Sequence, residues 1–336
     1  MKRMTNLFPA ITNIQNLMNA AQKAYRGKKN NQEANLFYFN LESEILKLEA
    51  ALINMTYHPA PYRSFKVYEP KERDICAASF RDRVVHHAIG NILDPIYEKS
   101  FINDSYACRK NKGVYAALLR TQVLSRKFKF FLKCDIRKYF ETIDHTILKE
   151  IICRKIKDKQ LIELLNIIID HPFPKEQEKK GIPIGNLTSQ LFANIYLDQL
   201  DHFIKDDSGV KGYIRYMDDF LLFAQSSKQL RMWQARLTDM IEKKLKLELK
   251  YEVLQLMPVF QGIPFLGFRI FPGLVRLQRK KLMRFRQNYQ KKEKQYFNGE
   301  IDKDFFIASI ESMIAHISWA NTYQMQQSFF NTGPCP

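Results

Sequence analysis

Cysteine is scarce in this sequence, and its few occurrences form no pattern. The five cysteines among 336 residues are odd in number and widely spaced, and no C-x-x-C pair is present. This spacing excludes a C-x-x-C zinc module and indicates no disulfide framework. Widely spaced, reduced thiols are typical of the cytoplasm, which is where we expect the protein to act.

Long apolar runs are also missing. No segment approaches the roughly 18 consecutive apolar residues of a membrane-spanning helix. The N-terminus, MKRMTNLFPAITNIQNL, begins with basic residues but contains no continuous apolar stretch, so we expect no signal peptide.

Acidic residues are much fewer than basic residues. The chain has 53 Lys and Arg against 35 Asp and Glu, which gives a formal net charge of +18. Such a chain repels itself unless a polyanion is present. We therefore expect nucleic acid as the partner, with an anionic membrane surface as the less favoured alternative.

The length and the apolar content predict more than one subdomain, because 336 residues at 46% hydrophobic exceed what one core usually accommodates. The patterns predict two helices before residue 58 and a hairpin with a charged tip over 65–79. The next helix is expected to end at Asp94-Pro95. Strand-like segments such as FKFFLKCDI and GYIRYMDDFLLFA then alternate with helices, which indicates an α+β fold around a small antiparallel sheet.

Two adjacent aspartates lie between apolar runs in the stretch RYMDDFLLF. A tight turn there would place Asp218 and Asp219 at a hairpin tip. Aspartate is common in turns for its own hydrogen bonds, so an isolated pair would indicate only a turn. Here the flanks are apolar enough to bury the turn, and buried carboxylates need a compensating charge. Mg²⁺ provides one while leaving positions for water and phosphate oxygens.

A third carboxylate, Asp135, directly follows the strand-like FLKC. Taken alone, it would be interpreted as the cap of the following helix. A neighbouring strand would bring it beside Asp218, and carboxylates that hold two metal ions can support an in-line phosphoryl displacement. In a chain of this charge the metal interpretation is favoured.

RYMDDFLLF resembles the Y-x-D-D box of reverse transcriptases, and FLKCDIRKYFETIDH resembles the block with their first catalytic carboxylate. Two fingers blocks, the template-contacting block and the primer-grip hairpin have their counterparts in KERDICAASFRDRVVHHAI, SYACRKNKG, GIPIGNLTSQLFANIYLDQLD and GIPFLGFRI. The six blocks follow the family's order over roughly residues 60 to 275. The resemblance implies an RNA-directed DNA polymerase with a right-hand fold. It would have an N-terminal helical extension over 1–60, fingers and palm over 61–275, and a basic helical thumb over 276–336.

The resemblance also implies roles for individual residues. Asp135 and Asp218 would be metal ligands, with Asp219 beside them and the carbonyl of Ile136 completing one site. Two Mg²⁺ ions are the implied cofactors, with Mn²⁺ as a substitute.

Five further residues would bind the incoming dNTP, namely Arg73, Arg109, Phe140, Ile184 and Gly185. Phe140 matches an aromatic ring that excludes a 2′-hydroxyl, with plain core packing as the alternative. Arg73 matches the arginine that grips the triphosphate, and Arg109 is a weaker candidate for the same neighbourhood. Either arginine is otherwise an ordinary surface residue.

The template block departs from most of the family, which has Q-G and then S-P. Here it reads IGNLTSQ, from Ile184 and Gly185 to Gln190. This variant is similar to the reverse transcriptases of diversity-generating retroelements, which make cDNA with errors at adenines and act with a small basic helical-bundle accessory protein. Most relatives have a Gln at the position of Ile184, and its side chain can form a hydrogen bond that Ile184 cannot form. Discrimination between correct and incorrect nucleotides at the nascent base pair should therefore be weaker.

The segment after residue 275 is strongly basic, with nine Lys or Arg between Arg276 and Lys294. A charge run is usually a solvated helix face, but in a thumb it would follow a template-primer backbone. The interleaved aromatics either pack on the palm or stack on bases. The residues expected to contact template or primer are Gln190, Gly267, Arg279, Lys280 and Arg284.

Some questions stay open at the level of sequence. The family often uses a lysine after the catalytic hairpin as a proton donor to pyrophosphate, and neither Lys246 nor Lys250 aligns decisively. An anti-phage defence reverse transcriptase would show the same chemistry. A non-catalytic RNA-binding scaffold is the third hypothesis, and the presence of all three aspartates disfavours it.

Overall fold

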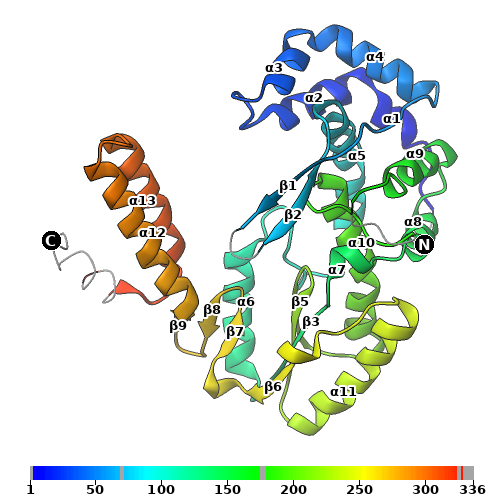
Figure 1. Cartoon of the computed structure of the whole chain (residues 1–336). Helices are drawn as coiled ribbons and strands as arrows, with labels where there is room; N and C mark the ends of the chain where they lie inside the picture. The colour runs from blue at the N-terminus through cyan, green and yellow to red at the C-terminus, as the bar shows by residue number, and fades with distance from the viewer. Residues whose placement is uncertain (1–2, 69–71, 175–178, 324–326, 328–336) are drawn as a thin grey trace.

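The computed structural model describes residues 3–68, 72–174, 179–323 and 327, and consists of helices around three small antiparallel sheets (Figure 1). The expected α+β class is confirmed. The tip of the predicted hairpin, residues 69–71, lies outside the described residues, as does Cys335. Among the described residues, no helix is both long and apolar enough to cross a membrane.

The N-terminal region forms four helices, so the prediction of two was wrong. They are α1 (Phe8–Thr12), α2 (Ile14–Tyr25), α3 (Gln32–Phe39) and α4 (Leu41–Ile53). The extra breaks occur at asparagines whose side chains cap a new helix: Asn13 accepts from the N–H of Gln15, and Asn31 from that of Ala34. Hydrophobic periodicity continues across such caps, which is why it did not reveal them.

A two-stranded hairpin, β1 (Arg63–Val67) and β2 (Arg73–Ala77), leads into α5 (Phe80–Glu98). The expected end of this helix at Asp94-Pro95 was wrong, because Pro95 lies inside it. A proline removes one intrahelical hydrogen bond. Packing offsets this loss, since Leu93 and Tyr97 on either side of the proline are buried in the core.

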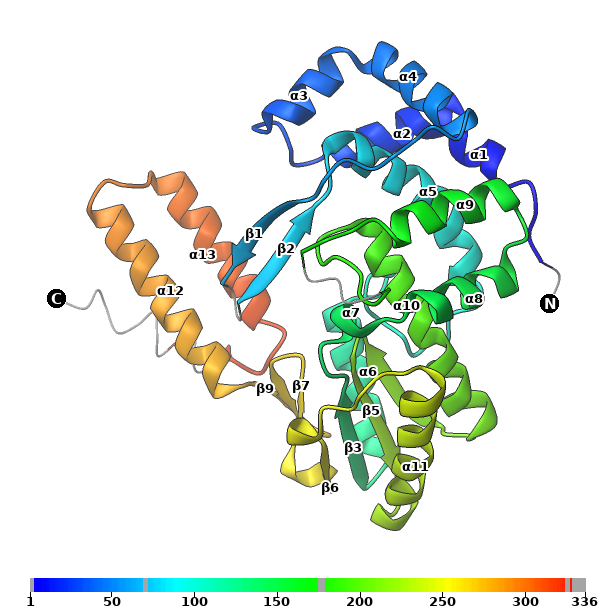
Figure 2. The same ribbon diagram turned by 45° about the vertical axis from the view of Figure 1, so that its right-hand side comes forward.

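The central sheet has the strand order β4-β5-β3-β6. Its strands are β3 (Phe130–Asp135), β4 (Gly212–Tyr216), β5 (Asp219–Ala224) and β6 (Gln255–Pro258). Successive side chains point to opposite faces, and both faces are covered: Leu132 and Leu222 belong to one core cluster, Phe131 and Phe223 to the other. Helix α11 (Ser227–Asp239) packs on β3 and β5, and α6 (Val114–Lys127) packs on β4 (Figure 2).

The remaining helices surround this sheet. They are α7 (Tyr139–Thr142), α8 (His145–Lys155), α9 (Lys159–Ile169) and α10 (Leu187–His202), with short π or 3-10 turns η1 (Phe203–Asp207), η2 (Met240–Lys244), η3 (Tyr251–Val253) and η4 (Val259–Gln261). Helix α10 is largely buried in the larger core cluster, where it packs against α5 and α8.

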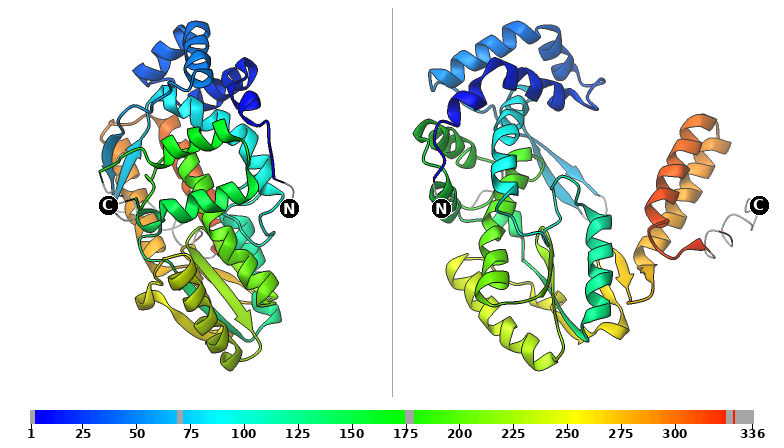
Figure 3. Two further views of the ribbon diagram at one scale, coloured as in Figure 1. Left: turned by 90° about the vertical axis from the view of Figure 1, so that its right-hand side faces the viewer. Right: turned by 180° about the vertical axis from the view of Figure 1, so that it is seen from behind.

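A third sheet, β7 (Ile263–Phe265), β8 (Phe268–Ile270) and β9 (Val275–Leu277), leads to the paired helices α12 (Arg279–Phe297) and α13 (Lys303–Ile317). The two helices extend to one side of the molecule (Figures 1 and 3). Strand β9 crosses the boundary that the sequence suggested between 275 and 276, so the helical pair begins with α12.

Candidate active site

The sheet register brings the three aspartates together. Asp135, the last residue of β3, pairs with Asp219, the first residue of β5. Tyr216 also pairs with Asp219, so Met217 and Asp218 form a two-residue turn between β4 and β5. The carboxylates thus lie at one end of the central sheet, in the arrangement that the sequence predicted.

The turn itself is strained. Met217 has a φ of +57°, a conformation that is unfavourable for a residue with a side chain. Strained residues persist where the surroundings fix them, and here Nη1 of Arg215 donates to the Met217 carbonyl at 3.1 Å.

Arg215 forms a buried charge network under this turn. Its fully buried guanidinium binds Asp201 with two bonds, from Nε at 2.7 Å and from Nη2 at 2.6 Å. It also donates to Asn194 at 3.2 Å and to the Ser105 hydroxyl at 3.0 Å. This pair was not predicted from the sequence, in which Asp201 is one of several aspartates between 198 and 207.

The carboxylates at the turn are only partly compensated by positive charge. Burial, reinforced by the charge of Asp135, raises the pKa of Asp218 to about 6. Burial also raises the pKa of Asp219 to about 7, against an opposing effect of Lys133. Within the described residues, Oδ1 of Asp219 is buried and has no hydrogen-bond partner. A cation beside this oxygen would correct both defects.

These donors fit a hard divalent cation held in an open site. In the part of the chain that the structure describes, no three His, Cys, Asp or Glu side chains form a ready-made metal cage. Mg²⁺ usually needs only one or two carboxylates, with water and substrate phosphates as its other ligands. The aspartate oxygens are therefore suitable donors, and the chemistry of the donor set favours Mg²⁺ or Mn²⁺ over softer metals.

The backbone of Ile136 is arranged so that its carbonyl is available on the side of the turn. Ile136 forms an isolated antiparallel bridge with Leu249, flanked by bonds from Arg137 N to Glu248 O and from Lys250 N to Asp135 O, each 2.8 Å long. In this pattern the N–H and C=O of the central residue face away from its partner strand.

Arg73 and Ile184 line one small pocket of about 90 Å³. The charge of Arg73 opposes the rise in the pKa of Asp218, so its guanidinium lies within electrostatic reach of that carboxylate. The N–H of Cys76 on β2 donates to the Ile184 carbonyl at 2.9 Å, which fixes the position of this loop.

Gly185 and Asn186 continue the docking of this loop onto β2. Gly185 has a φ of +119°, and a Cβ there would lie 2.7 Å from the Ile75 side chain, so only glycine fits. The Asn186 side chain accepts from Ala78 N and donates to Cys76 O, both at 3.1 Å. Asn186 was not among the residues predicted from the sequence.

Phe140 borders the same region. Its ring is partly buried against the core and meets Tyr139 edge to face, with centroids 5.6 Å apart. Its carbonyl accepts a 2.7 Å bond from the N–H of Ile182, another residue that lines the pocket with Arg73.

Arg109 has a structural environment rather than a free guanidinium. Its side chain is 5% exposed and pairs with Glu98 at 2.7 Å. It also donates to the carbonyls of Ile102 and Ser105 at 2.6 and 2.8 Å. These bonds hold the loop after α5, so we withdraw the nucleotide-binding role suggested for Arg109. Gln190 is half-buried and lines a pocket of about 510 Å³ together with Arg109 and Glu98.

The expected template and primer contacts lie around the start of α12. Leu266 and Gly267 both have positive φ in the β7–β8 turn, and Nζ of Lys281 donates to the Leu266 carbonyl at 3.0 Å. Arg279 and Lys280 are exposed in the first turn of α12, and Arg284 is half-buried one turn later.

Two aromatic side chains of α12 contact the partner helix α13. Phe285 is buried, while Tyr289 and Tyr296 contact Phe306 of α13.

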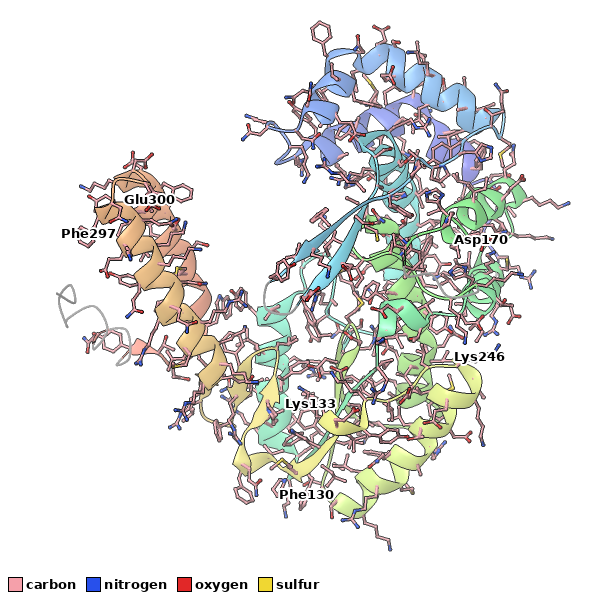
Figure 4. All side chains as sticks on the ribbon, viewed as in Figure 1. Phe130, Lys133, Asp170, Lys246, Phe297 and Glu300 are labelled. Atoms are coloured by element: carbon pink, nitrogen blue, oxygen red, sulfur yellow. The ribbon has the colours of Figure 1, made fainter. Side chains whose placement is uncertain are left out.

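The two candidate lysines have different surroundings. Lys246 donates to Asp144 at 3.3 Å and lies at the outer edge of the sheet region (Figure 4). Lys250 is the residue opposite Asp135, because its N–H donates to the Asp135 carbonyl. Residues directly opposite on antiparallel strands present their side chains on the same face.

These elements have the arrangement of a right-hand polymerase fold. The palm is the small antiparallel sheet with the aspartate turn and the helices behind it, and the thumb is the separate helical pair. Comparison with known families agrees. The model for reverse transcriptase (RNA-dependent DNA polymerase) matches residues 66–270, more than half of the chain. The chain belongs to the reverse transcriptase family.

The chain is also similar to curated proteins and to solved structures. The chain is 26% identical over 301 residues to the group II intron-encoded protein LtrA of Lactococcus lactis subsp. cremoris, covering 68% of this chain and 50% of LtrA. It is 27% identical over 277 residues to protein YkfC of Escherichia coli (strain K12), covering 68% of this chain and 71% of YkfC. Apo telomerase from Candida tropicalis, truncated from its C-terminal domain, matches with a TM-score of 0.48 and 14% identity, covering 68% of this chain and 59% of that one. The chain thus spans about half the length of LtrA.

Proposed function

We propose that this chain is an RNA-directed DNA polymerase that copies a template RNA into cDNA. The observation that carries the proposal is the pairing of Asp135 with Asp219 beside the strained turn at Asp218. Membership of the reverse transcriptase family supports it.

Asp135 and Asp218 would hold two Mg²⁺ ions, with Asp219 beside them and the Ile136 carbonyl as a further ligand. When bound, these ions supply activation of the primer hydroxyl and neutralisation of the charge on the leaving pyrophosphate. The chain contributes the geometry: the buried Arg215 network fixes the turn, and the sheet register fixes Asp135 relative to it.

We assign selection of the incoming nucleotide to residues in and around the pocket that Arg73 and Ile184 line. Arg73 would pair with the triphosphate, for which a guanidinium fork is well suited. The half-buried ring of Phe140 would exclude a 2′-hydroxyl by contact, so dNTPs are the expected substrates. We therefore expect the protein to extend a primer with dNTPs but not with rNTPs.

Template and primer would lie along the β7–β8 turn, α12 and Gln190. The first turn of α12 contains Arg279, Lys280 and Lys281 and no acidic residue. Cations are unfavourable at a helix N-terminus unless an anion compensates them, and the phosphates of a duplex would do so.

The proposed proton donor to pyrophosphate is Lys250, since Lys246 is engaged with Asp144. Lys250→Ala should lower kcat for nucleotide incorporation about a hundredfold, because a lost general acid typically costs this much. Lys246→Ala is the matched control and should stay within about twofold of wild type. Single-turnover incorporation with saturating dNTP measures both; a larger loss in Lys246→Ala would reverse the assignment.

The particular biology proposed is that of a diversity-generating retroelement, with cDNA synthesis that is error-prone at adenines. The IGNLTSQ variant supports this, with Ile184 at a position where most relatives offer a hydrogen bond. A small basic helical-bundle accessory protein is the expected partner, and the cytoplasm the expected compartment.

Ile184→Gln should reduce misincorporation opposite template adenine about fivefold, because a regained hydrogen bond is worth about 1 kcal/mol of discrimination. Ile184→Leu keeps the apolar character and should leave the error rate unchanged. Sequencing of cDNA made on one RNA template by the three proteins measures the effect. Equal error rates in wild type and Ile184→Gln would contradict the role of this position.

Primer extension on an RNA template with Mg²⁺ tests the proposed function as a whole. A labelled primer should be extended to full-length cDNA with all four dNTPs, and sequencing should show the complement of the template. Absence of extension with Mg²⁺ and with Mn²⁺ would overturn the proposal.

A further inference from the structure

Lys133 lies among the catalytic carboxylates, and no motif assigns it a role. It precedes Asp135 by two residues on β3, so the two side chains share one face of the sheet. Asp219, opposite Asp135, lies on the same face. The Lys133 Nζ is 3.4 Å from Oδ2 of Asp219, and Figure 4 shows Lys133 in the middle of the palm.

The ion pair is largely shielded from water. The side chain of Lys133 is 17% exposed and that of Asp219 is 19% exposed. The ammonium binds Oδ2, whereas Oδ1 of Asp219 is the buried oxygen without a partner. Lys133 thus compensates one half of this carboxylate and leaves the other half for a further cation.

A second bond of Lys133 reaches a different sheet. Its Nζ donates to the carbonyl of Pro264 on β7 at 3.0 Å. The same hairpin presents the Leu266 carbonyl to Lys281 of α12 at 3.0 Å. Two lysine bonds therefore connect the catalytic turn, the β7–β8 hairpin and the root of the thumb.

We propose that Lys133 is a positioning residue that holds Asp219 against β7 in the metal-free protein and competes with a divalent cation for Asp219. This inference deepens the proposed function and rests on it. Competition weakens metal binding before substrate arrives. A nucleotide adds phosphate ligands, so firm metal binding is coupled to the presence of the dNTP.

The test compares Lys133→Met and Lys133→Arg with a matched control, Lys205→Met. Lys205 is a similar lysine, 24% exposed and paired with Asp104 at 2.9 Å, outside the catalytic turn. Thermal unfolding of each full chain is followed in EDTA and across a titration with Mn²⁺, without nucleic acid or dNTP.

Lys133→Met should unfold at a lower temperature than wild type in EDTA, because the carboxylates lose their resident cation. Mn²⁺ should then stabilise it more than it stabilises wild type, with the half-saturating concentration about fivefold lower. Lys133→Arg retains the charge and should resemble wild type. The unfolding temperature of Lys205→Met should lie below that of wild type by the same amount in EDTA and in Mn²⁺.

Two outcomes would overturn the inference in distinguishable ways. If Lys133→Met behaves like Lys205→Met, with a loss that does not depend on Mn²⁺, Lys133 is an ordinary structural lysine and the proposed polymerase function is unaffected. If Mn²⁺ has no effect on the wild type or on Lys133→Met, the proposed metal site falls, and the inference falls with it.

Discussion

Asp218→Asn is expected to lower the rate of nucleotide incorporation about a thousandfold or more, and Asp219→Asn by a smaller factor of about ten to a hundred. Asp218 is assigned as a direct metal ligand, and losing about 4 kcal/mol of transition-state stabilisation corresponds to a thousandfold. Asp219 shares its charge with Lys133, so its replacement should remove less. Single-turnover incorporation at fixed Mg²⁺ measures both variants.

The control for these variants is their folding. Burial and the charge of Asp135 raise the pKa of Asp218 in the folded protein. The ionised carboxylate therefore destabilises the folded state at neutral pH. Asp218→Asn should therefore be at least as stable as wild type in EDTA at neutral pH. An Asp218→Asn variant that keeps a tenth of the wild-type rate would contradict the assignment.

Arg215→Met is expected to lower the free energy of unfolding by about 3 to 5 kcal/mol, because it leaves Asp201 charged and unpaired in the core. It also removes the bond to the Met217 carbonyl, so polymerase activity should be lost together with stability. Arg215→Lys should not rescue the protein, since an ammonium cannot reproduce the two-bond contact with Asp201. Urea unfolding at neutral pH measures the difference.

Arg137→Ala is the matched control for the loss of an arginine ion pair. Arg137 contacts Glu248 and Glu252, but the side chains in this cluster are well exposed, between 38% and 60%. Its replacement should leave the free energy of unfolding close to that of wild type, because exposed ion pairs contribute little to stability. Comparable losses in Arg215→Met and Arg137→Ala would show that the buried network does not carry the stability attributed to it.

The catalytic turn was predictable from the sequence because its signals are local. Strand patterns on both sides of Asp218 and Asp219 fixed the hairpin, and the apolar run before Asp135 fixed the end of β3. The antiparallel register then places these residues together without further information. The helices after residue 278 were also expected, because the sequence there is strongly basic and helical in pattern.

The failures concern interactions between residues distant in sequence or effects of packing. The pairing of Asp201 with Arg215 joins a helix to a strand, and Asn186 bonds to Ala78 and Cys76 across 108 and 110 positions. Neither leaves a periodic trace in the sequence. Pro95 suggested a helix end by a sound local rule, but the buried neighbours of this proline outweigh the lost hydrogen bond.

Arginines at candidate binding positions were the least predictable of all. Arg73 and Arg109 both lie in segments that resemble fingers blocks. The structure brings Arg73 into electrostatic reach of Asp218, whereas Arg109 is used by Glu98 and two carbonyls. Motif position alone did not distinguish an arginine that is available to a ligand from one that holds a loop.

The central claim is that Asp135, Asp218 and Asp219 together support Mg²⁺-dependent copying of RNA into DNA. The most direct measurement is primer extension on one RNA template with Mg²⁺ and dNTPs, by the wild type and by the double variant Asp218→Asn, Asp219→Asn. Full-length cDNA from the wild type and none from the folded double variant is the predicted result. Equal synthesis by the two proteins would contradict the account.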